Sequence, residues 1–217
     1  MLILEIITGV LLPWVLVAPT IPLLLLLIRR NHIDKTTIAL SLLCVVSFLA
    51  NVSILVASGT ELQRSFLEVG FLTEIVFTGL LLKYCTESQL LRYSIISAIL
   101  IFGSVYITFI GLSPGTGTSM INTIGASMIF LISILVLLGK TNRIDQNLVT
   151  TPEFWFAGGI FLHFGLLDLL MLNGKKITDL NYDSPDDFSV LYVIVSVLQF
   201  LFFAAGILIR KPWANKE

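Results

Sequence analysis

The sequence predicts an all-α polytopic membrane protein, a single domain over residues 1–217 built as a bundle of about seven transmembrane helices. The chain is 56% hydrophobic and 12% charged, with a mean hydropathy of +0.97. A soluble domain carries about twice that charged fraction. Seven apolar runs are each long enough to cross the roughly 30 Å hydrocarbon core of a bilayer. Basic residues gather in alternate gaps between these runs.

The gaps predict how the bundle is oriented. Ten of the 13 Lys and Arg residues fall in the first, third and fifth gaps and in the C-terminal tail, when Arg92 at the very start of the fourth span is counted with the third gap. Because basic residues are retained on the cytoplasmic side, we expect the N-terminus outside and the C-terminus in the cytoplasm. The predicted spans are Leu4–Ile28, Thr37–Val56, Phe66–Leu82, Leu91–Leu112, Ile121–Leu138, Phe154–Leu172 and Phe188–Ile209.

The first span contains three prolines, Pro13, Pro19 and Pro22. Each proline removes a backbone N–H and clashes with the preceding turn, so this helix should be kinked or broken. One interpretation is a tolerated kink of the kind common in membrane helices. The other is a hinge or unwound stretch that exposes backbone to a cavity, as in transporters.

The second and third spans carry the first polar candidates. Asn51 lies toward the predicted outer end of the second span. In the third span Glu68 lies in the outer half and Glu74 near the middle. A charge at the bilayer centre costs about 2.5–3.5 kcal/mol on insertion scales, so Glu74 is the strongest functional candidate. The fourth span, Leu91–Leu112, adds no candidate.

The last three spans add Asn122, His163, Asp168 and Gln199. His163 and Asp168 are five residues apart, about 140° around a helix, so they cannot form one compact dyad on a single face. His163 can meet Glu74 only if the third and sixth helices are neighbours. A packing histidine and a proton-handling histidine are both open interpretations.

These polar side chains gather in the predicted outer half or near the midplane, which favours a small polar pocket that opens outward. Its candidate ligand-binding residues are Glu74, His163, Asp168, Asn51, Asn122, Gln199 and Glu68. The alternative is interhelical hydrogen bonding, worth about 0.6–2 kcal/mol per side chain. That alternative suits the three amides best when each is taken singly.

A loop between the last two spans contains a partial calcium motif. Asp179, Asn181 and Asp183 have the one–three–five spacing that opens a calcium loop. Ser184 stands where the motif needs Gly, and Val190 where it needs a bidentate Glu. We therefore expect a solvated acidic loop, and no metal site is predicted.

Other chemistries are disfavoured by composition. Cys44 is expected mid-membrane and Cys85 on the inner side, which makes a disulfide improbable. A net charge of −1 without a basic block opposes nucleic-acid binding. The last span has no lysine for a retinal Schiff base, and one intramembrane histidine cannot ligate a haem from both sides, so no cofactor is expected. Tyr192 and Trp155, near span ends, are predicted to be interfacial anchors.

The start of the sixth span reads Pro152-Glu-Phe154-Trp155-Phe-Ala-Gly-Gly159-Ile-Phe-Leu. It resembles the P-x-F-W-x-x-x-G-x-x-[LI] stretch of bacterial seven-helix membrane modules, found alone or ahead of sensor histidine kinases. The glutamate of the third helix, Glu74, is similar as well. The resemblance implies a bacterial inner-membrane location and an input module whose output lies in another polypeptide. Trp155 would then mark a coupling surface.

Three functional hypotheses follow. The first is a non-enzymatic sensor or accessory subunit that binds a small ligand from the outer side and acts through a protein partner or a homo-oligomer in the lipid. The second is a small proton- or ion-coupled transporter or channel that uses Glu74. The third is a membrane-embedded lipid-modifying enzyme with Glu74, His163 and Asp168 as acid–base groups, which lacks a recognisable nucleophile or metal set.

Overall fold

The described chain is helical throughout, as the apolar runs predict. The computed structural model describes residues 13–29, 34–57, 61–112, 118–141, 148–173 and 187–210. Within these ranges no strand occurs, and the all-α fold class is confirmed. The elements are α2 (Thr20–Ile28), α3 (Lys35–Val56), α4 (Glu61–Cys85), α5 (Gln89–Leu112), α6 (Thr118–Thr141), the short 3₁₀ helix η1 (Leu148–Thr150), α7 (Pro152–Leu172) and α8 (Asp187–Ile209).

Six of these helices, α3 to α8, are long and apolar enough to cross a membrane, and 13–28 forms a shorter apolar helix. The chain is therefore membrane-embedded by composition, with six or seven spans. The helices run a few residues past the predicted spans, as in α4, which covers Glu61–Cys85 where Phe66–Leu82 was predicted. The apolar run that predicts a span ends at the first polar residues, whereas the backbone hydrogen bonds of the helix continue to its capping residue.

The first span is broken, as its prolines predict. Residues 13–17 are helical, Ala18 and Pro19 form a turn, and α2 begins at Thr20. Pro19 has no N–H to donate to the carbonyl of Val15, four residues earlier. That carbonyl instead accepts a hydrogen bond of 3.2 Å from the Asn51 side-chain nitrogen on α3. The break is thus tied to a neighbouring helix.

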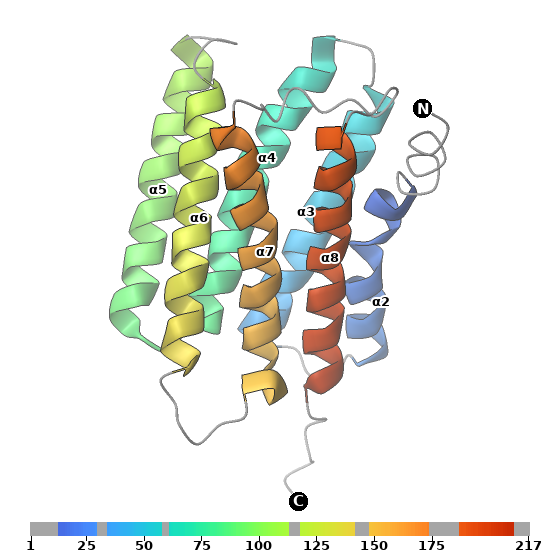
Figure 1. The fold of residues 1–217 in the computed structure, drawn as a ribbon, viewed down its shortest axis with the longest axis vertical. Coiled ribbons are helices and arrows are strands. Elements are labelled where there is room, and N and C mark those ends of the chain that lie inside the picture. The colour runs from blue at the N-terminus through green and yellow to red at the C-terminus, as the bar shows by residue number, and fades with distance from the viewer. Residues whose placement is uncertain are drawn as a thin grey trace, which may run out of the picture.

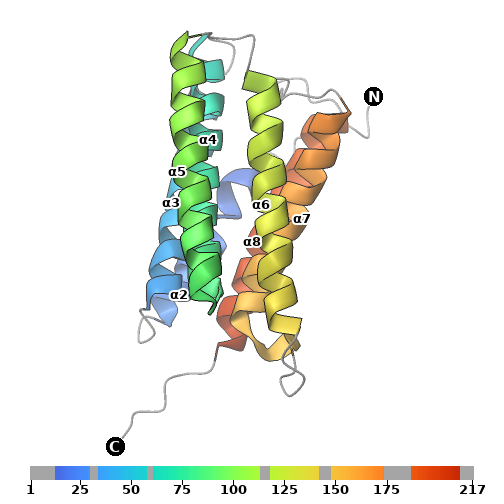
Figure 2. The ribbon, with the colours of Figure 1, turned by 90° about the vertical axis from the view of Figure 1, so that its left-hand side faces the viewer.

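The helices form two layers (Figures 1 and 2). One layer contains α3, α4 and α5, and the other contains α6, α7 and α8. The short α2 packs at the edge, against both α3 and α8. Helix α4 packs against α3 and α5 in its own layer and against α6 and α7 in the other. Its middle residues therefore lie at the centre of the bundle.

One end of the bundle collects the positive charge. Helices α2, α4, α6 and α8 end there, and α3, α5 and α7 begin there (lower end of Figure 1). We call it the basic end; its described basic residues are Arg29, Lys35, Lys83, Arg92, Lys140 and Arg210. The structure confirms that the alternate gaps share one end.

Arg29 closes the C-terminus of α8 at the basic end. Its Nη1 donates to the carbonyls of Ile207 and Leu208, both at 2.9 Å, and to that of Arg210 at 3.1 Å. The last carbonyls of a helix lack intrahelical partners and carry partial negative charge. A guanidinium from α2 therefore joins the broken first span to the last helix.

Asp34 links the same region to the start of α3. It caps the helix by accepting a 2.8 Å hydrogen bond from the backbone N–H of Thr37, and it forms an ion pair with Arg210. Partial burial alone would raise the pKa of Asp34. The Thr37 N–H and the Arg210 guanidinium outweigh it, and the pKa lies below its ordinary value.

Candidate functional site

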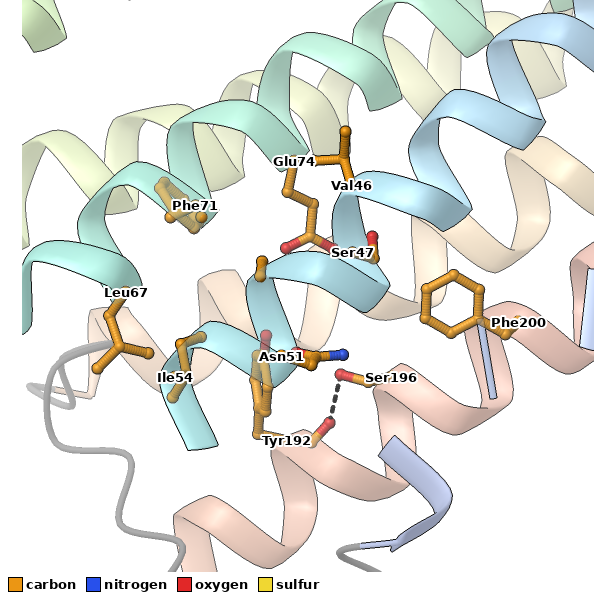
Figure 3. Close-up of a pocket in the computed structure, with 12 residues that line it drawn as sticks. Val46, Ser47, Asn51, Ile54, Leu67, Phe71, Glu74, Tyr192, Ser196 and Phe200 are labelled. Atoms are coloured by element: carbon orange, nitrogen blue, oxygen red, sulfur yellow. Dashed lines mark hydrogen bonds between the residues drawn. The ribbon is translucent and has the colours of Figure 1, made fainter. Parts of the chain in front are cut away.

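A small pocket lies between α3, α4 and α8 (Figure 3). The pocket has a volume of about 30 Å³, counted as the space that the centre of a water molecule can occupy. That is room for about two water molecules. Its polar lining residues are Ser47 and Asn51 from α3, Glu74 from α4, and Tyr192 and Ser196 from α8. Two of these, Asn51 and Glu74, were predicted site residues.

The pocket runs from the middle of the bundle toward the end opposite the basic one. On α4 its lining goes from Glu74 to Leu67, toward the start of that helix. On α3 it goes from Ser47 to Ile54, toward the end of that helix. Because α3 and α4 are antiparallel, both series lead away from the basic end.

His163 of α7 stands beside Glu74. Its Nε2 lies 3.5 Å from Glu74 Oε1, so α4 and α7 are neighbours, as this contact requires. This is an ion-pair distance, but it is longer than an ordinary hydrogen bond, and neither His163 nitrogen has a hydrogen-bond partner. The His163 side chain is only 1% exposed and that of Glu74 is 15% exposed.

An isolated charge in such apolar surroundings is costly. Two states of the Glu74–His163 pair avoid a net charge: a carboxyl with a neutral imidazole, and a carboxylate with an imidazolium. A proton can occupy either side chain. The pair is thus a place where a proton can be held at the centre of the bundle.

Two hydrogen bonds orient the polar groups of the pocket. The Asn51 nitrogen donates to the Val15 carbonyl, and the Ser196 hydroxyl donates to the Tyr192 carbonyl at 2.8 Å. The hydroxyl oxygen of Ser47 is buried and has no partner.

Asp168 does not join this group. Its carboxylate accepts a 2.5 Å hydrogen bond from Ser127 of α6, so it links α7 to α6. Glu68 lies outside the pocket lining and pairs with Arg64 one turn earlier, at 3.3 Å. The Tyr106 hydroxyl of α5 donates to the Glu68 backbone carbonyl at 3.0 Å. These contacts are of the interhelical kind that was the alternative interpretation.

The remaining amides are buried apart from the pocket lining. Asn122 is 1% exposed and its side-chain oxygen lacks a partner. Gln199 is 1% exposed and neither of its amide atoms is paired. Buried polar groups without protein partners are usually satisfied by water. Neither amide contributes to the pocket lining.

Trp155 packs within the chain. Its indole N–H donates to the Val149 carbonyl of η1 at 2.8 Å, and its ring lies 5.4 Å from that of Phe202 on α8. These contacts hold the turn before α7 against α8. Its role as a coupling surface stays a prediction, and the calcium candidates Asp179, Asn181 and Asp183 lie outside the described residues.

Sequence reasoning missed Ser47 and Ser196 and misplaced Tyr192. The Tyr192 ring lines the pocket and lies 5.8 Å from that of His163, so the interfacial-anchor prediction was wrong about its position. A signal was available: Tyr192, Ser196 and Gln199 recur at helical spacing on one face of an otherwise apolar helix.

Between the pocket and the basic end the buried side chains are mainly apolar, with two polar ones, Thr78 of α4 and Gln199 of α8, one turn beyond Glu74 and Ser196. Leu40 and Leu43 of α3, Leu81 and Leu82 of α4, and Phe203 of α8 are all fully buried. The residues that line the pocket thus end near the middle of the bundle.

Comparison with known proteins gives no match to a protein family, to a curated protein or to a solved structure. The functional argument therefore rests on the geometry of the pocket.

Proposed function

We propose that this protein is an integral membrane sensor or accessory subunit that binds a small ligand in the Glu74 pocket and acts through a partner protein. The observation that carries the proposal is the contact between Glu74 and His163 at the inner end of a polar pocket. Ionisable groups so deep in a membrane bundle are costly and mark functional sites by default. Their contact gives a two-state element that ligand binding can shift.

A pocket that leads from the middle of the bundle toward one end suits binding better than passage. Leu43, Leu82 and Phe203 are packed between Glu74 and the basic end. A ligand that enters the pocket would change the charge balance of the Glu74–His163 pair without crossing the bundle. That change would be read out through helix packing.

We also propose the membrane orientation and the cellular location that the sequence predicts. The basic end faces the cytoplasm of a bacterial cell, and the pocket faces the outside. The resemblance of the α7 start to modules found alone or ahead of sensor kinases supports a role as a signalling input. Trp155, near the basic end, is the proposed contact with the partner protein or with a second copy of the chain.

Infrared spectroscopy of the protein in lipid nanodiscs tests the site. A titratable carboxyl band that Glu74→Gln removes is expected, since a pocket open to water lets Glu74 exchange its proton. Glu68→Gln is the matched control, because Glu68 is a buried carboxyl of the same helix outside the pocket. If Glu74→Gln removes no carboxyl band, the proposal is contradicted.

Native mass spectrometry of the protein extracted from its own membranes tests the output. We expect a stoichiometric second polypeptide or a defined homo-oligomer. A bare monomer in gentle detergent would contradict the sensor or accessory role.

A proton- or ion-coupled transporter is the second candidate. It is favoured by the broken first span, whose Val15 carbonyl contacts Asn51 of the pocket, since broken helices line transporter sites. Proton or ion flux into liposomes that Glu74→Gln abolishes would favour transport over sensing.

A further inference from the structure

We propose that the basic end binds the headgroup of an anionic phospholipid where α2, α3 and α8 meet, with the lipid phosphate on the Arg29 guanidinium. The residues concerned are Arg29, Asp34, Lys35 and Arg210, and we call them the α2 corner. The inference goes beyond the proposed function. It uses no residue of the Glu74 pocket, which leads toward the other end of the bundle.

The α2 corner is held together by direct contacts. Arg29 Nη1 donates to the Arg210 carbonyl at 3.1 Å, and the Arg210 guanidinium forms an ion pair with the Asp34 carboxylate. Lys35 follows Asp34 in the chain and is exposed. The corner therefore contains three cations and one carboxylate, which leaves a net positive charge.

Arg29 presents one edge of its guanidinium to a further ligand. Its three hydrogen bonds to the carbonyls of α8 all use Nη1. Nε and Nη2 have no partner among the residues that the structure describes. The hydrogens of these two nitrogens point the same way, and this fork matches two oxygens of a phosphate. Because the Nη1 bonds already hold the side chain in place, binding a phosphate costs little side-chain entropy.

Lys35 is the second cation of the corner with no partner among the described residues. The remaining basic side chains of this end each have a neighbour that occupies them. These contacts join Arg92 to the Thr86 carbonyl at 2.8 Å, Lys140 to Glu87 at 3.2 Å, and the Lys83 nitrogen to the Tyr84 ring at 5.0 Å. Unpaired positive charge is thus concentrated at the α2 corner.

The corner lies at the depth of a lipid headgroup. Helix α2 is apolar from Ile21 to Ile28 and is followed at once by Arg29, and a basic residue at the end of an apolar helix places its charge at the membrane interface. Leu24, Leu27 and Ile28 are 57%, 69% and 78% exposed. Since α2 packs at the edge of the bundle (right-hand side of Figure 1), acyl chains can lie along it while the phosphate contacts Arg29. A soluble acidic protein would leave this apolar face uncovered.

Charge selects an anionic headgroup over a zwitterionic one. A zwitterionic headgroup brings its own ammonium, which Arg29 and Lys35 repel, whereas an anionic headgroup compensates their charge. Each basic residue near the membrane surface strengthens the binding of anionic lipid about fivefold. In the proposed orientation the corner meets the cytoplasmic leaflet, whose surface potential is negative.

Native mass spectrometry of the full chain, in micelles with equal amounts of phosphatidylglycerol and phosphatidylcholine, tests the site. We expect the chain to retain phosphatidylglycerol over phosphatidylcholine by roughly twentyfold, from the two unpaired cations. Lys35→Gln should reduce this preference about fivefold, and Arg29→Gln should reduce it at least as much. Lys83→Gln is the matched control, because it removes one lysine charge from the same end outside the corner, and it should leave the preference unchanged.

Several outcomes would overturn the site. Equal retention of the two lipids is one, and an equal loss of preference in Lys35→Gln and Lys83→Gln is another. If Arg29→Gln does not fold because Arg29 caps α8, Lys35→Gln decides, since the exposed Lys35 side chain has no partner among the described residues.

Competition separates a lipid from other anions. Sodium phosphate, compared with NaCl at equal ionic strength, should not displace phosphatidylglycerol. Displacement by millimolar phosphate would show a site for a free anion and overturn the lipid proposal. A chain that leaves its own membranes with a second polypeptide and without anionic lipid would overturn it as well. The infrared test of Glu74 is independent of these results, so the proposed function stands or falls separately.

Discussion

The hydrogen bond from Asn51 to the Val15 carbonyl should be coupled to Pro19. Pro19 leaves this carbonyl without a helical donor, and Asn51 supplies one from α3 at 3.2 Å. In the Pro19→Ala variant the backbone N–H of residue 19 is restored and can donate to Val15 itself. Asn51→Ala should therefore destabilise the natural chain but cost much less in the Pro19→Ala background.

The expected coupling is about 1 kcal/mol. A neutral interhelical hydrogen bond in a membrane protein contributes about 0.6 kcal/mol on average and at most about 1.7. Leaving a buried carbonyl without a partner costs roughly 1–3 kcal/mol. The Val15 carbonyl lies beside the pocket, where a water can replace part of the lost bond, so the lower part of that range applies.

Reversible unfolding by SDS in mixed micelles, followed by circular dichroism, measures the four free energies of this double-mutant cycle. Asn122→Ala is the matched control, because it removes an asparagine of α6 that is buried more deeply than Asn51 and should be additive with Pro19→Ala. If the effects of Asn51→Ala and Pro19→Ala on the free energy of unfolding add within about 0.3 kcal/mol, the coupling is refuted. The break in the first span would then have no energetic link to Asn51 of the pocket.

Two further predictions concern packing and acid stability. Gly159→Ala should destabilise the fold by about 1–3 kcal/mol, since the added Cβ would lie 2.9 Å from Phe202 Cβ. Gly158→Ala is the control and should be tolerated, because its Cβ would meet only ring atoms of Phe202 at 3.6 Å. The same SDS titration compares the two variants, and equal losses of stability would contradict the packing. Asp34→Asn should keep the cap, since the amide oxygen can accept from the Thr37 N–H, but it removes the ion pair with Arg210, worth about 0.2–1 kcal/mol. The pKa of Asp34 is lowered in the folded chain. Its contribution to the free energy of unfolding is therefore complete above the unfolded-state pKa of about 3.9, and it is lost as pH falls through the folded-state pKa. Stability measured against pH should show natural chain and variant converging in acid; a constant difference would contradict this.

The fold was predictable because it depends on features that are local in sequence. A span requires only about twenty apolar residues, and the shared end requires only the order of the gaps. The break at Pro19 follows from the chemistry of one residue. None of these needs knowledge of which helices touch.

The site depended on that knowledge. Glu74 and Asn51 were found because polar groups are rare at such depth, but the contact of Glu74 with His163 exists only because α4 packs on α7. Ser47 and Ser196 gave no signal of their own, since serine is common in membrane helices and often bonds its own backbone. Tyr192 lies near a helix end in sequence, which does not say toward which neighbour its ring points.

Two physical causes would place positive charge at the basic end: the capping of helix ends and the proposed cytoplasmic orientation. Arg29 donates to the last carbonyls of α8, and Arg92 donates to the carbonyl of Thr86 just after α4. Such capping would favour basic residues wherever several helices end, whatever the membrane orientation. Lys35 is different, because it is the first residue of α3, where the helix dipole disfavours a cation. Capping cannot account for Lys35, so it carries more weight than Arg29 in assigning this end to the cytoplasm.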